Sequence, residues 1–233
     1  MKNSIKRFIP GWLLGWYRNR NTNSRKFRNK SAKDVFTEIY ESNHWESSES
    51  KSGTGSEFIK TESLIKGIDK LLIEMNIKSV LDLPCGDYEW MQKVDMSNIN
   101  YIGADIVEAL IEDNIKQYKE TEKRKFKVLN IITDPLPKCD LIIVRDCFVH
   151  LSYDDINSAI QNIKASGSKY LLTTTFTKHN QNHDIVTGNW RALNLLEKPF
   201  NFSPPMTVLV ENCTEGSGIY TDKAMALWEI SKI

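Results

Sequence analysis

Short apolar runs alternate with helical patterns along most of the chain. The apolar runs predict strands at Ser79–Leu83, Tyr101–Asp105, Lys125–Asn130, Asp140–Val144 and Lys169–Thr175. Segments in which apolar residues recur at helical spacing predict helices at Trp90–Val94, Val107–Tyr118 and Tyr153–Lys164. Because the strands carry few alternating polar residues, this order predicts a parallel sheet that helices cover on both faces, joined by right-handed crossovers.

The two ends of this alternating region have different patterns. The strand-like runs "MTVLVENC" (206–213) and "KAMALWEI" (223–230) are joined by the turn-rich "TEGSGIYTD", which predicts an antiparallel hairpin at the edge of the sheet. Upstream, "SAKDVFTEIYESNHW" (31–45) and Phe58–Met75 have helical patterns, separated by a Ser/Gly-rich stretch. We therefore expect an α/β domain over residues 57–233, preceded by residues 1–56 with a basic arm, a helix and the Ser/Gly-rich segment.

The net charge of +1 conceals an uneven distribution. Residues 1–33 contain ten Lys and Arg residues and no acid, so the rest of the chain is acidic overall. Trp12, Trp16 and Tyr17 among these basic residues favour a segment at a membrane interface, and a tail that packs on its own domain is the alternative. Because the apolar stretch is too short to span a bilayer, we expect a cytoplasmic protein with peripheral contact at the inner face of the membrane.

Composition also narrows the classes of site and partner. The four cysteines are far apart in the sequence, which predicts buried thiols in a reducing compartment rather than a zinc site. His183 and Asp184 are adjacent and make a poor chelate, so we expect no metal. The acidic body disfavours nucleic acid as a partner.

The first predicted strand ends in an acidic turn with a single glycine. In "VLDLPCGD", Asp82 and Asp87 flank the turn, and Gly86 allows the backbone to approach a ligand closely. The next strand ends in "YIGADIV", where Asp105 stands at the spacing of an acid that hydrogen-bonds ribose hydroxyls; a helix N-cap is the structural alternative. Two acids and one glycine disfavour a dinucleotide pyrophosphate and favour a cationic ligand.

With these motifs the sequence resembles the class I S-adenosylmethionine-dependent methyltransferases. "VLDLPCGD" is similar to their first motif, "YIGADIV" to their second, and "VLNIITDPLPKCDLIIVRDCFVHLS" to the rest of the cofactor site and the fourth strand. The resemblance covers roughly residues 57–233 and implies S-adenosylmethionine as cofactor. It also implies a doubly wound, mostly parallel, seven-stranded Rossmann-like sheet with a C-terminal antiparallel hairpin. Pro84 stands where the family commonly has glycine.

The resemblance implies roles for single residues. The turn after the first strand would lie beside the methionine portion of the cofactor, Asp105 would hold the ribose, and Asn130 would meet the adenine amine. The implied cofactor-binding residues are Asp82, Pro84, Gly86, Asp105, Ile106, Asn130, Ile131 and Arg145, together with Ser52, Gly53, Gly55 and Ser56 of "SKSGTGSEF". In methyltransferases of similar N-terminal pattern this last stretch covers the cofactor's carboxylate, and a flexible linker is the alternative.

The methyl acceptor is expected at the C-terminal ends of the fourth and fifth strands. His150 is the candidate general base because histidine titrates near neutral pH, and Asp146 would orient it or accept a substrate hydroxyl. A structural role for His150, or pairing between Arg145 and Asp146, is the alternative. The long polar segment after the fifth strand predicts a functional loop. The candidate substrate-binding residues are Asn182, Asp184, Trp190, Arg191 and, further upstream, Trp45.

Further stretches narrow the expected function. "NHDIVTGNWRALNL" and "LLTTTF" resemble a bacterial subgroup found with capsule and surface-polysaccharide biosynthesis. The resemblance implies an O-methyltransferase whose acceptor is a small molecule or a saccharide-linked hydroxyl, phosphate or phosphoramidate oxygen. A catalytically silent cofactor-binding subunit and a methyltransferase of protein or RNA stay open. "DLPCGD" lacks the G-x-G-x-x-G turn of an NAD-dependent dehydrogenase, which excludes that class.

Overall fold

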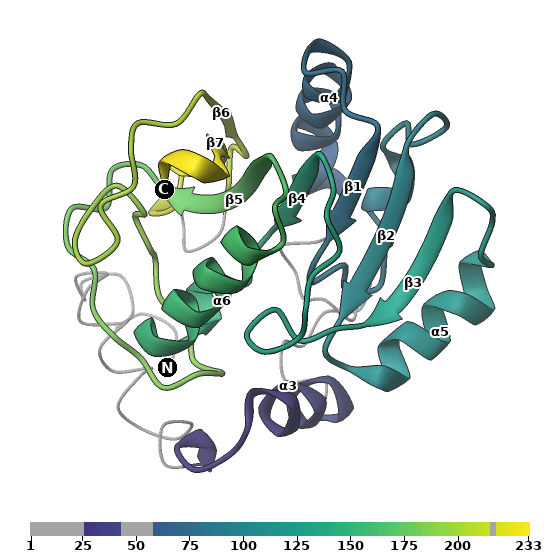
Figure 1. Ribbon diagram of the computed structural model, residues 1–233. Helices are drawn as coiled ribbons and strands as arrows, with labels where there is room; N and C mark the ends of the chain where they lie inside the picture. Colours follow the sequence, from purple (N-terminus) through teal and green to yellow (C-terminus); the bar gives the residue numbers. More distant parts are fainter. Residues whose placement is uncertain (1–25, 43–57, 215–217) are drawn as a thin grey trace, which may run out of the picture.

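A computed structural model describes residues 26–42, 58–214 and 218–233, and these fold around one seven-stranded sheet (Figure 1). The strand order is β3-β2-β1-β4-β5-β7-β6, and the pairs among the first five strands are parallel. The strands are β1 (Ser79–Asp82), β2 (Asn100–Asp105), β3 (Arg124–Val128), β4 (Leu141–Val144), β5 (Tyr170–Phe176), β6 (Thr207–Val210) and β7 (Lys223–Glu229). The predicted fold class is confirmed.

The C-terminal strands form the antiparallel part of the sheet. Strand β7 lies between β5 and β6 and is antiparallel to both. Its register with β5 runs from Tyr170 opposite Glu229 to Phe176 opposite Lys223. The predicted hairpin is therefore confirmed, and the antiparallel direction brings the first residue of β7 to the carboxyl ends of the parallel strands.

Four α-helices and three short 3₁₀ helices accompany the described strands. The α-helices are α3 (Ala32–Glu41), α4 (Phe58–Glu74), α5 (Glu108–Tyr118) and α6 (Tyr153–Ala165), and the 3₁₀ helices are η3 (Met91–Lys93), η4 (Phe148–His150) and η5 (Ile230–Lys232). Side chains of Ser31 and Ser152 cap α3 and α6 by accepting hydrogen bonds from backbone N–H groups of their first turns. The helix predicted at Trp90–Val94 is wrong in type, since an apolar segment this short forms only the single 3₁₀ turn η3.

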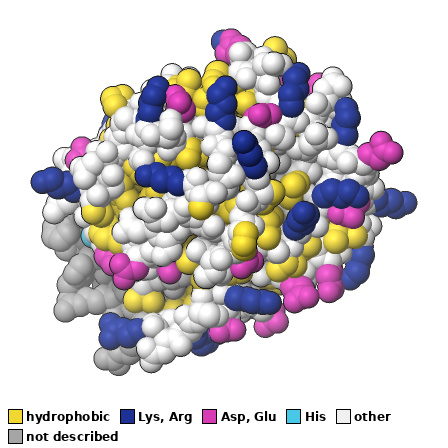
Figure 2. Space-filling view, in the orientation of Figure 1, with side chains coloured by type: hydrophobic (Ala, Val, Ile, Leu, Met, Phe, Trp, Pro, Cys, Tyr) yellow, Lys and Arg dark blue, Asp and Glu magenta, His cyan; other side chains and the backbone are white. Residues whose placement is uncertain are grey.

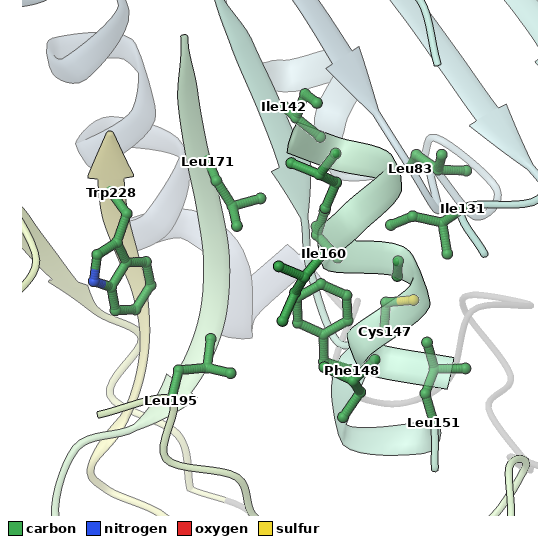
Figure 3. Close-up of a cluster of buried hydrophobic side chains, with 14 of the residues drawn as sticks. Leu83, Ile131, Ile142, Cys147, Phe148, Leu151, Ile160, Leu171, Leu195 and Trp228 are labelled. Carbon is green, nitrogen blue, oxygen red and sulfur yellow. The ribbon is translucent and has the colours of Figure 1, made fainter. Parts of the chain in front are cut away.

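Two buried clusters lie on opposite faces of the sheet. One packs α6 against the sheet, and Figure 3 shows Ile142 and Leu171 on the face towards this helix, which contributes Ile160. The other cluster combines apolar residues of α4 with Ile111 of α5. The core is therefore layered as helix, sheet and helix, and the carboxyl ends of the parallel strands are left uncovered by these three helices.

Residues 177–206 connect β5 to β6 without a helix or strand. The segment is nevertheless packed, because Leu193, Leu195 and Phe202 are buried in the cluster on the α6 face. Asn182 also donates hydrogen bonds from Nδ2 to the carbonyls of Asn194 and Lys198. The predicted long polar segment is thus a fixed part of the domain in which side chains bond to backbone.

The surface carries charges of both signs, interspersed over the face drawn in Figure 2. Among the described residues, no helix has the length and apolar character needed to cross a membrane. All four cysteines are free and buried, which agrees with the predicted buried thiols. Residues 1–25, which make up most of the basic arm, and the Ser/Gly-rich stretch lie outside the described residues. The predicted roles of these segments therefore stay predictions.

Candidate functional site

A cavity lies at the carboxyl ends of β1, β2, β3 and β4, with α3 along one side. Its walls come from the turns that follow these four strands and from Ala32, Phe36 and Tyr40 of the helix. The cavity brings together nine residues that the sequence analysis selects: Pro84, Gly86, Asp105, Ile106, Asn130, Ile131, Arg145, Asp146 and His150. Residues far apart in the chain therefore meet in one place.

The turn after β1 is fixed against β2 and α5. The N–H of Cys85 donates to the carbonyl of Ala104 at 2.7 Å, and the N–H of Gly86 donates to Oδ2 of Asp105 at 3.3 Å. On the other side, Nδ2 of Asn114 donates to the carbonyl of Gly86 at 2.7 Å. Gly86 has φ of +54°, a conformation that glycine adopts without steric cost. The glycine is thus required by the turn itself.

Asp105 is buried at the cavity wall, where its carboxylate accepts two backbone hydrogen bonds. Besides Gly86, the N–H of Val107 donates to Oδ1 at 3.0 Å. Val107, and not Asp105, occupies the N-cap position of α5, so the N-cap alternative does not describe this residue. Burial raises the pKa of Asp105 to about 6. A buried carboxylate facing a cavity is a site for a hydroxyl or a cation, which would compensate its loss of hydration.

Asp82 lies behind the cavity wall rather than on it, which differs from the predicted placement. Its side chain is buried, and the hydroxyl of Tyr101 donates to Oδ2 at 2.7 Å. Burial raises the pKa of Asp82 to about 7. Tyr101 in turn packs against the rings of Tyr88 and Phe126. The Asp82 carboxylate is therefore bonded to β2 and does not line the cavity.

Asn130 and Ile131 form the adenine side of the predicted site. Oδ1 of Asn130 accepts from the N–H of Ile132 at 2.9 Å, which leaves the Nδ2 amide as a donor group. Ile106 and Ile131 are apolar wall residues of the same cavity. This side of the cavity combines flat apolar surface with a single amide, as a purine ring requires.

A buried cluster of ion pairs borders the cavity on its other side. Nζ of Lys223 lies 2.6 Å from Oδ2 of Asp146, and an Nη atom of Arg145 lies 2.6 Å from Oε2 of Glu211. The pairs are linked, since Arg145 Nη1 is 3.5 Å from Asp146 Oδ2. The predicted pairing of Arg145 with Asp146 is thereby confirmed, within a larger group.

Asp146 is held in an unusual conformation by this cluster. Its φ is +51°, and its N–H donates to Oγ1 of Thr174 at 2.8 Å. Burial alone would raise the pKa of Asp146, but the charges of Lys223 and Arg145 hold it well below its usual range. Asp146 is therefore a permanent carboxylate, suited to accepting a hydrogen bond and poorly suited to taking up a proton.

A hydrogen bond to the backbone orients the imidazole of His150. Nδ1 lies 2.9 Å from the carbonyl oxygen of Asn189, which can only accept, so Nδ1 carries the proton and Nε2 is the accepting atom. Burial lowers the pKa of His150 to about 4. The imidazole is therefore neutral at physiological pH and is a weak base.

The candidate substrate residues of the 177–206 segment do not line the cavity. Asp184 accepts from the backbone N–H of Tyr153, and Arg191 is buried with Nη1 donating to the carbonyls of Phe148 and Val149. Together with Asn182, these residues fix the segment to the domain. Trp190 packs edge-to-face on Phe176 and Tyr220 beside the end of β5.

Sequence reasoning missed the partners of the cavity residues. Lys223 is the first residue of the apolar strand β7, and Glu211 directly follows the apolar strand β6. Phe36 lines the cavity, whereas the sequence pattern places it only in a helix. The signal was present for Lys223, because it shares its strand face with the buried Met225 and Leu227. A lysine on the buried face of a strand indicates a buried anionic partner.

Five predicted residues (Trp45, Ser52, Gly53, Gly55 and Ser56) lie outside the described residues. Within the described residues, no three His, Cys, Asp or Glu side chains gather as ligands for a metal ion.

No protein-family model matches the sequence, and no curated protein matches it. Among solved structures, the chain is similar to magnesium protoporphyrin IX methyltransferase (ChlM) from Synechocystis PCC 6803 with bound SAM. The identity is 11%, over 86% of this chain and 97% of that chain, with a TM-score of 0.59.

Two further solved structures have similar folds. Human N-acetylserotonin methyltransferase (ASMT) in complex with SAM matches at 13% identity over 92% of this chain and 64% of that chain, with a TM-score of 0.55. The methyltransferase domain of bacterial CtHen1 matches at 12% identity over 72% and 98%, with a TM-score of 0.54. The chain therefore has the Rossmann-like methyltransferase fold.

Proposed function

We propose that this chain is an S-adenosylmethionine-dependent methyltransferase. The observation that carries the proposal is the cavity in which the buried carboxylate of Asp105 meets the Gly86 turn and the wall of Asn130 and Ile131. These groups fit the cofactor, since a carboxylate suits ribose hydroxyls and apolar walls suit a flat purine. When bound, the cofactor supplies a methyl group on a cationic sulfonium.

The chain's own residues divide the cavity between them. Asp105 would hold the ribose, and Ile106 and Ile131 would flank the adenine. Asn130 would donate to a ring nitrogen of the adenine, because its oxygen already accepts from Ile132. The turn at Pro84 and Gly86 would lie along the methionine portion, held in place by the hydrogen bond from Asn114 to the carbonyl of Gly86.

The acceptor would bind beside the ion-pair cluster. Asp146 presents a carboxylate that would orient an acceptor hydroxyl, and Nε2 of His150 would take its proton as the methyl group is transferred. Both groups are weak bases. An acceptor oxygen that is already ionised has no proton to lose and would need neither group as base.

We further propose a small-molecule or saccharide-linked acceptor, with oxygen as the methylated atom. The resemblance of "NHDIVTGNWRALNL" to a subgroup found with capsule biosynthesis supports a role in surface-polysaccharide synthesis. Trp190 and Tyr220 support it as well, because paired aromatic rings near the end of β5 are a suitable platform for a sugar ring. Methylation of protein or RNA is the second candidate.

Titration calorimetry with S-adenosylmethionine and S-adenosylhomocysteine tests the cofactor site. Asp105→Asn keeps the shape of the side chain and removes its charge, and Glu112→Gln is the matched control on the exposed face of α5. We expect Asp105→Asn to lose about tenfold or more in affinity, since a hydrogen bond to a charged group contributes roughly 1.5–3 kcal/mol. A wild-type protein that binds neither ligand would refute the proposal, and turnover without a partner separates an enzyme from a silent subunit.

The basic arm is proposed to hold the enzyme at a membrane surface, since residues 1–33 carry ten basic residues and no acid. Removing residues 1–33 should abolish sedimentation of the protein with anionic vesicles. With neutral vesicles, neither the full nor the shortened chain should sediment. Equal sedimentation of the full and shortened chains with anionic vesicles would contradict this.

A further inference from the structure

Helix α3 lies at the arrowhead end of the parallel strands, apart from the three helices that cover the sheet (Figure 1). One side of it contributes Ala32, Phe36 and Tyr40 to the cavity wall. The hydroxyl of Tyr40 donates to Oδ2 of Asp113 on α5 at 2.9 Å, which ties the C-terminal end of the helix to the ribose side of the cavity. Helix α3 thus forms one side of the cofactor cavity and is anchored across it.

The other side of α3 is seated on residues 186–189 of the long segment. Phe27, Val35 and Ile39 form a small buried cluster there, with Val186 packed against it. The closest approach is at Gly188. A Cβ atom on this residue would lie 2.4 Å from Cγ1 of Val35 and 2.8 Å from Cδ2 of Phe27. Gly188 also has φ of +97°, so glycine is required both by the backbone and by the helix packed on it.

Two of these four residues, Gly188 and Asn189, also hold His150. The N–H of Gly188 donates to the carbonyl of His150 at 2.8 Å, and the carbonyl of Asn189 accepts from Nδ1 of the imidazole. One residue earlier, Oγ1 of Thr187 accepts from the N–H of Ser152 at 2.9 Å. The seat of α3 and the support of His150 are therefore one junction.

We propose that Gly188 is a positioning residue that couples helix α3, which covers one side of the cofactor cavity, to His150. This inference rests on the proposed function. A ligand that contacts Phe36 and Tyr40 shifts or fixes helix α3. Because Val35 and Phe27 pack against Gly188, a shift of the helix is transmitted to the backbone at Gly188. The backbone of 188–189 then sets the orientation of the imidazole. Cofactor binding thereby fixes the accepting Nε2 before the acceptor is methylated, so that alignment at the acceptor side depends on an occupied cofactor cavity.

The test compares two glycines in the full chain. Gly188→Ala places a methyl group into the α3 seat. Gly167→Ala is the matched control, because it also has positive φ (+67°) but its Cβ would meet only Cδ of Lys138 at 3.9 Å. We expect Gly188→Ala to lower the affinity for S-adenosylhomocysteine by about tenfold, because overpacking displaces the helix from its seat. Gly167→Ala should leave the affinity unchanged.

A second readout separates positioning from simple packing. In nitrogen–proton spectra of the histidine rings, saturating S-adenosylhomocysteine should shift the His150 signals of the wild type and of Gly167→Ala. The shift should be lost in Gly188→Ala. Should Gly188→Ala fail to fold, Tyr40→Phe removes the hydrogen bond to Asp113 and should speed ligand dissociation several-fold.

The outcomes distinguish the two proposals. A wild-type chain that does not bind S-adenosylhomocysteine overturns the proposed function, and the coupling falls with it. A wild type that binds, beside a Gly188→Ala variant with unchanged affinity and an unchanged His150 shift, overturns the coupling alone. An unchanged rate of S-adenosylhomocysteine dissociation in Tyr40→Phe would contradict the role of α3 as one side of the cofactor cavity.

Discussion

Two halves of the cavity, one proposed to bind the cofactor and the other the acceptor, are built by different means. In the cofactor half, each strand is followed by a tight turn whose bonds reach short distances along the chain, as between Gly86 and Asp105. In the acceptor half, the bonds join residues that are far apart in sequence, as Asp146 with Lys223 and Arg145 with Glu211. The first half carries few charges besides its acids, and the second contains a network of four charges, in which Arg145, Glu211 and Lys223 are buried and Asp146 is partly exposed.

This difference determines how each half can respond to change. A carboxyl with a raised pKa, such as Asp82, can become neutral when it loses its partner. Asp146 has a strongly lowered pKa and stays charged, so losing a partner leaves a buried charge uncompensated. The acceptor half should therefore be more sensitive to single substitutions.

The largest expected effect concerns His150 and depends on the acceptor. With a hydroxyl acceptor, His150→Ala should lower kcat by about two to four orders of magnitude, because the proton loses its acceptor. With a phosphate or phosphoramidate acceptor, already ionised at neutral pH, kcat should change little. Steady-state rates with both acceptor types check this. The control variant is His183→Ala, which replaces an exposed histidine of the 177–206 segment. Equal losses with both types would assign His150 a structural role through Asn189.

The next effect concerns stability. Lys223→Met should lower the free energy of unfolding by about 3 kcal/mol, because it leaves Asp146 and Glu211 with Arg145 as their remaining partner. Lys223→Arg should retain most of the stability. Lys232→Met, which removes an exposed pair with Glu229, is the matched control and should leave the free energy of unfolding almost unchanged, because solvent screens exposed pairs. Denaturant titration measures all three, and a loss for Lys223→Met as small as the control's would contradict the description of the cluster.

The smallest effect is a pH dependence that arises from two carboxyl groups in the half of the cavity proposed for the cofactor. Asp82 and Asp105 have folded pKa values of about 7 and about 6, above the usual 3.8. Their contribution to stability is therefore fully present below the unfolded pKa and is lost as the pH rises through the folded values. Cofactor affinity should move the other way, since it requires ionised carboxylates, and should fall as the pH is lowered through about 6.

Calorimetry and thermal unfolding over this pH range test the opposite trends. Asp105→Asn should flatten the pH dependence of cofactor affinity. Asp146 should stay ionised throughout because its pKa is well below its usual range. His150, whose pKa of about 4 lies below its usual value, opposes this trend in ligand-free stability, so the decisive comparison is between variants. An Asp105→Asn variant whose cofactor affinity and stability keep the pH dependence of the wild type would contradict this assignment.

The sequence predicts the local half of the site much better than the other half. Strands β1 and β2 and the residues of their turns follow from apolar runs that end in acids and a glycine, and all of that information lies within a few residues. The pairing of Asp146 with Lys223 could not be found in this way. Lys223 reaches Asp146 only because β7 inserts antiparallel beside β5, which places Lys223 opposite Phe176.

Arg191 and Trp190 illustrate a second limit. Both were selected for polarity or aromatic surface on a long loop, where substrate contact is the usual expectation. In the structure Arg191 is buried against backbone carbonyls, and Asn182 and Asp184 bond to backbone as well. A segment without helix or strand must satisfy its buried polar groups with side chains, and the sequence does not distinguish that use from ligand binding.

The place of β7 has a consequence for how the chain is assembled on the ribosome. Synthesis releases β1 to β5 first, together with every residue that bonds the turns of the cofactor half. Strand β6 emerges next, but it pairs only with β7, so it has no place in the sheet until β7 arrives. Until then Asp146 and Arg145 lack Lys223, and a chain released before β7 would have a formed cofactor pocket beside an unfinished acceptor side.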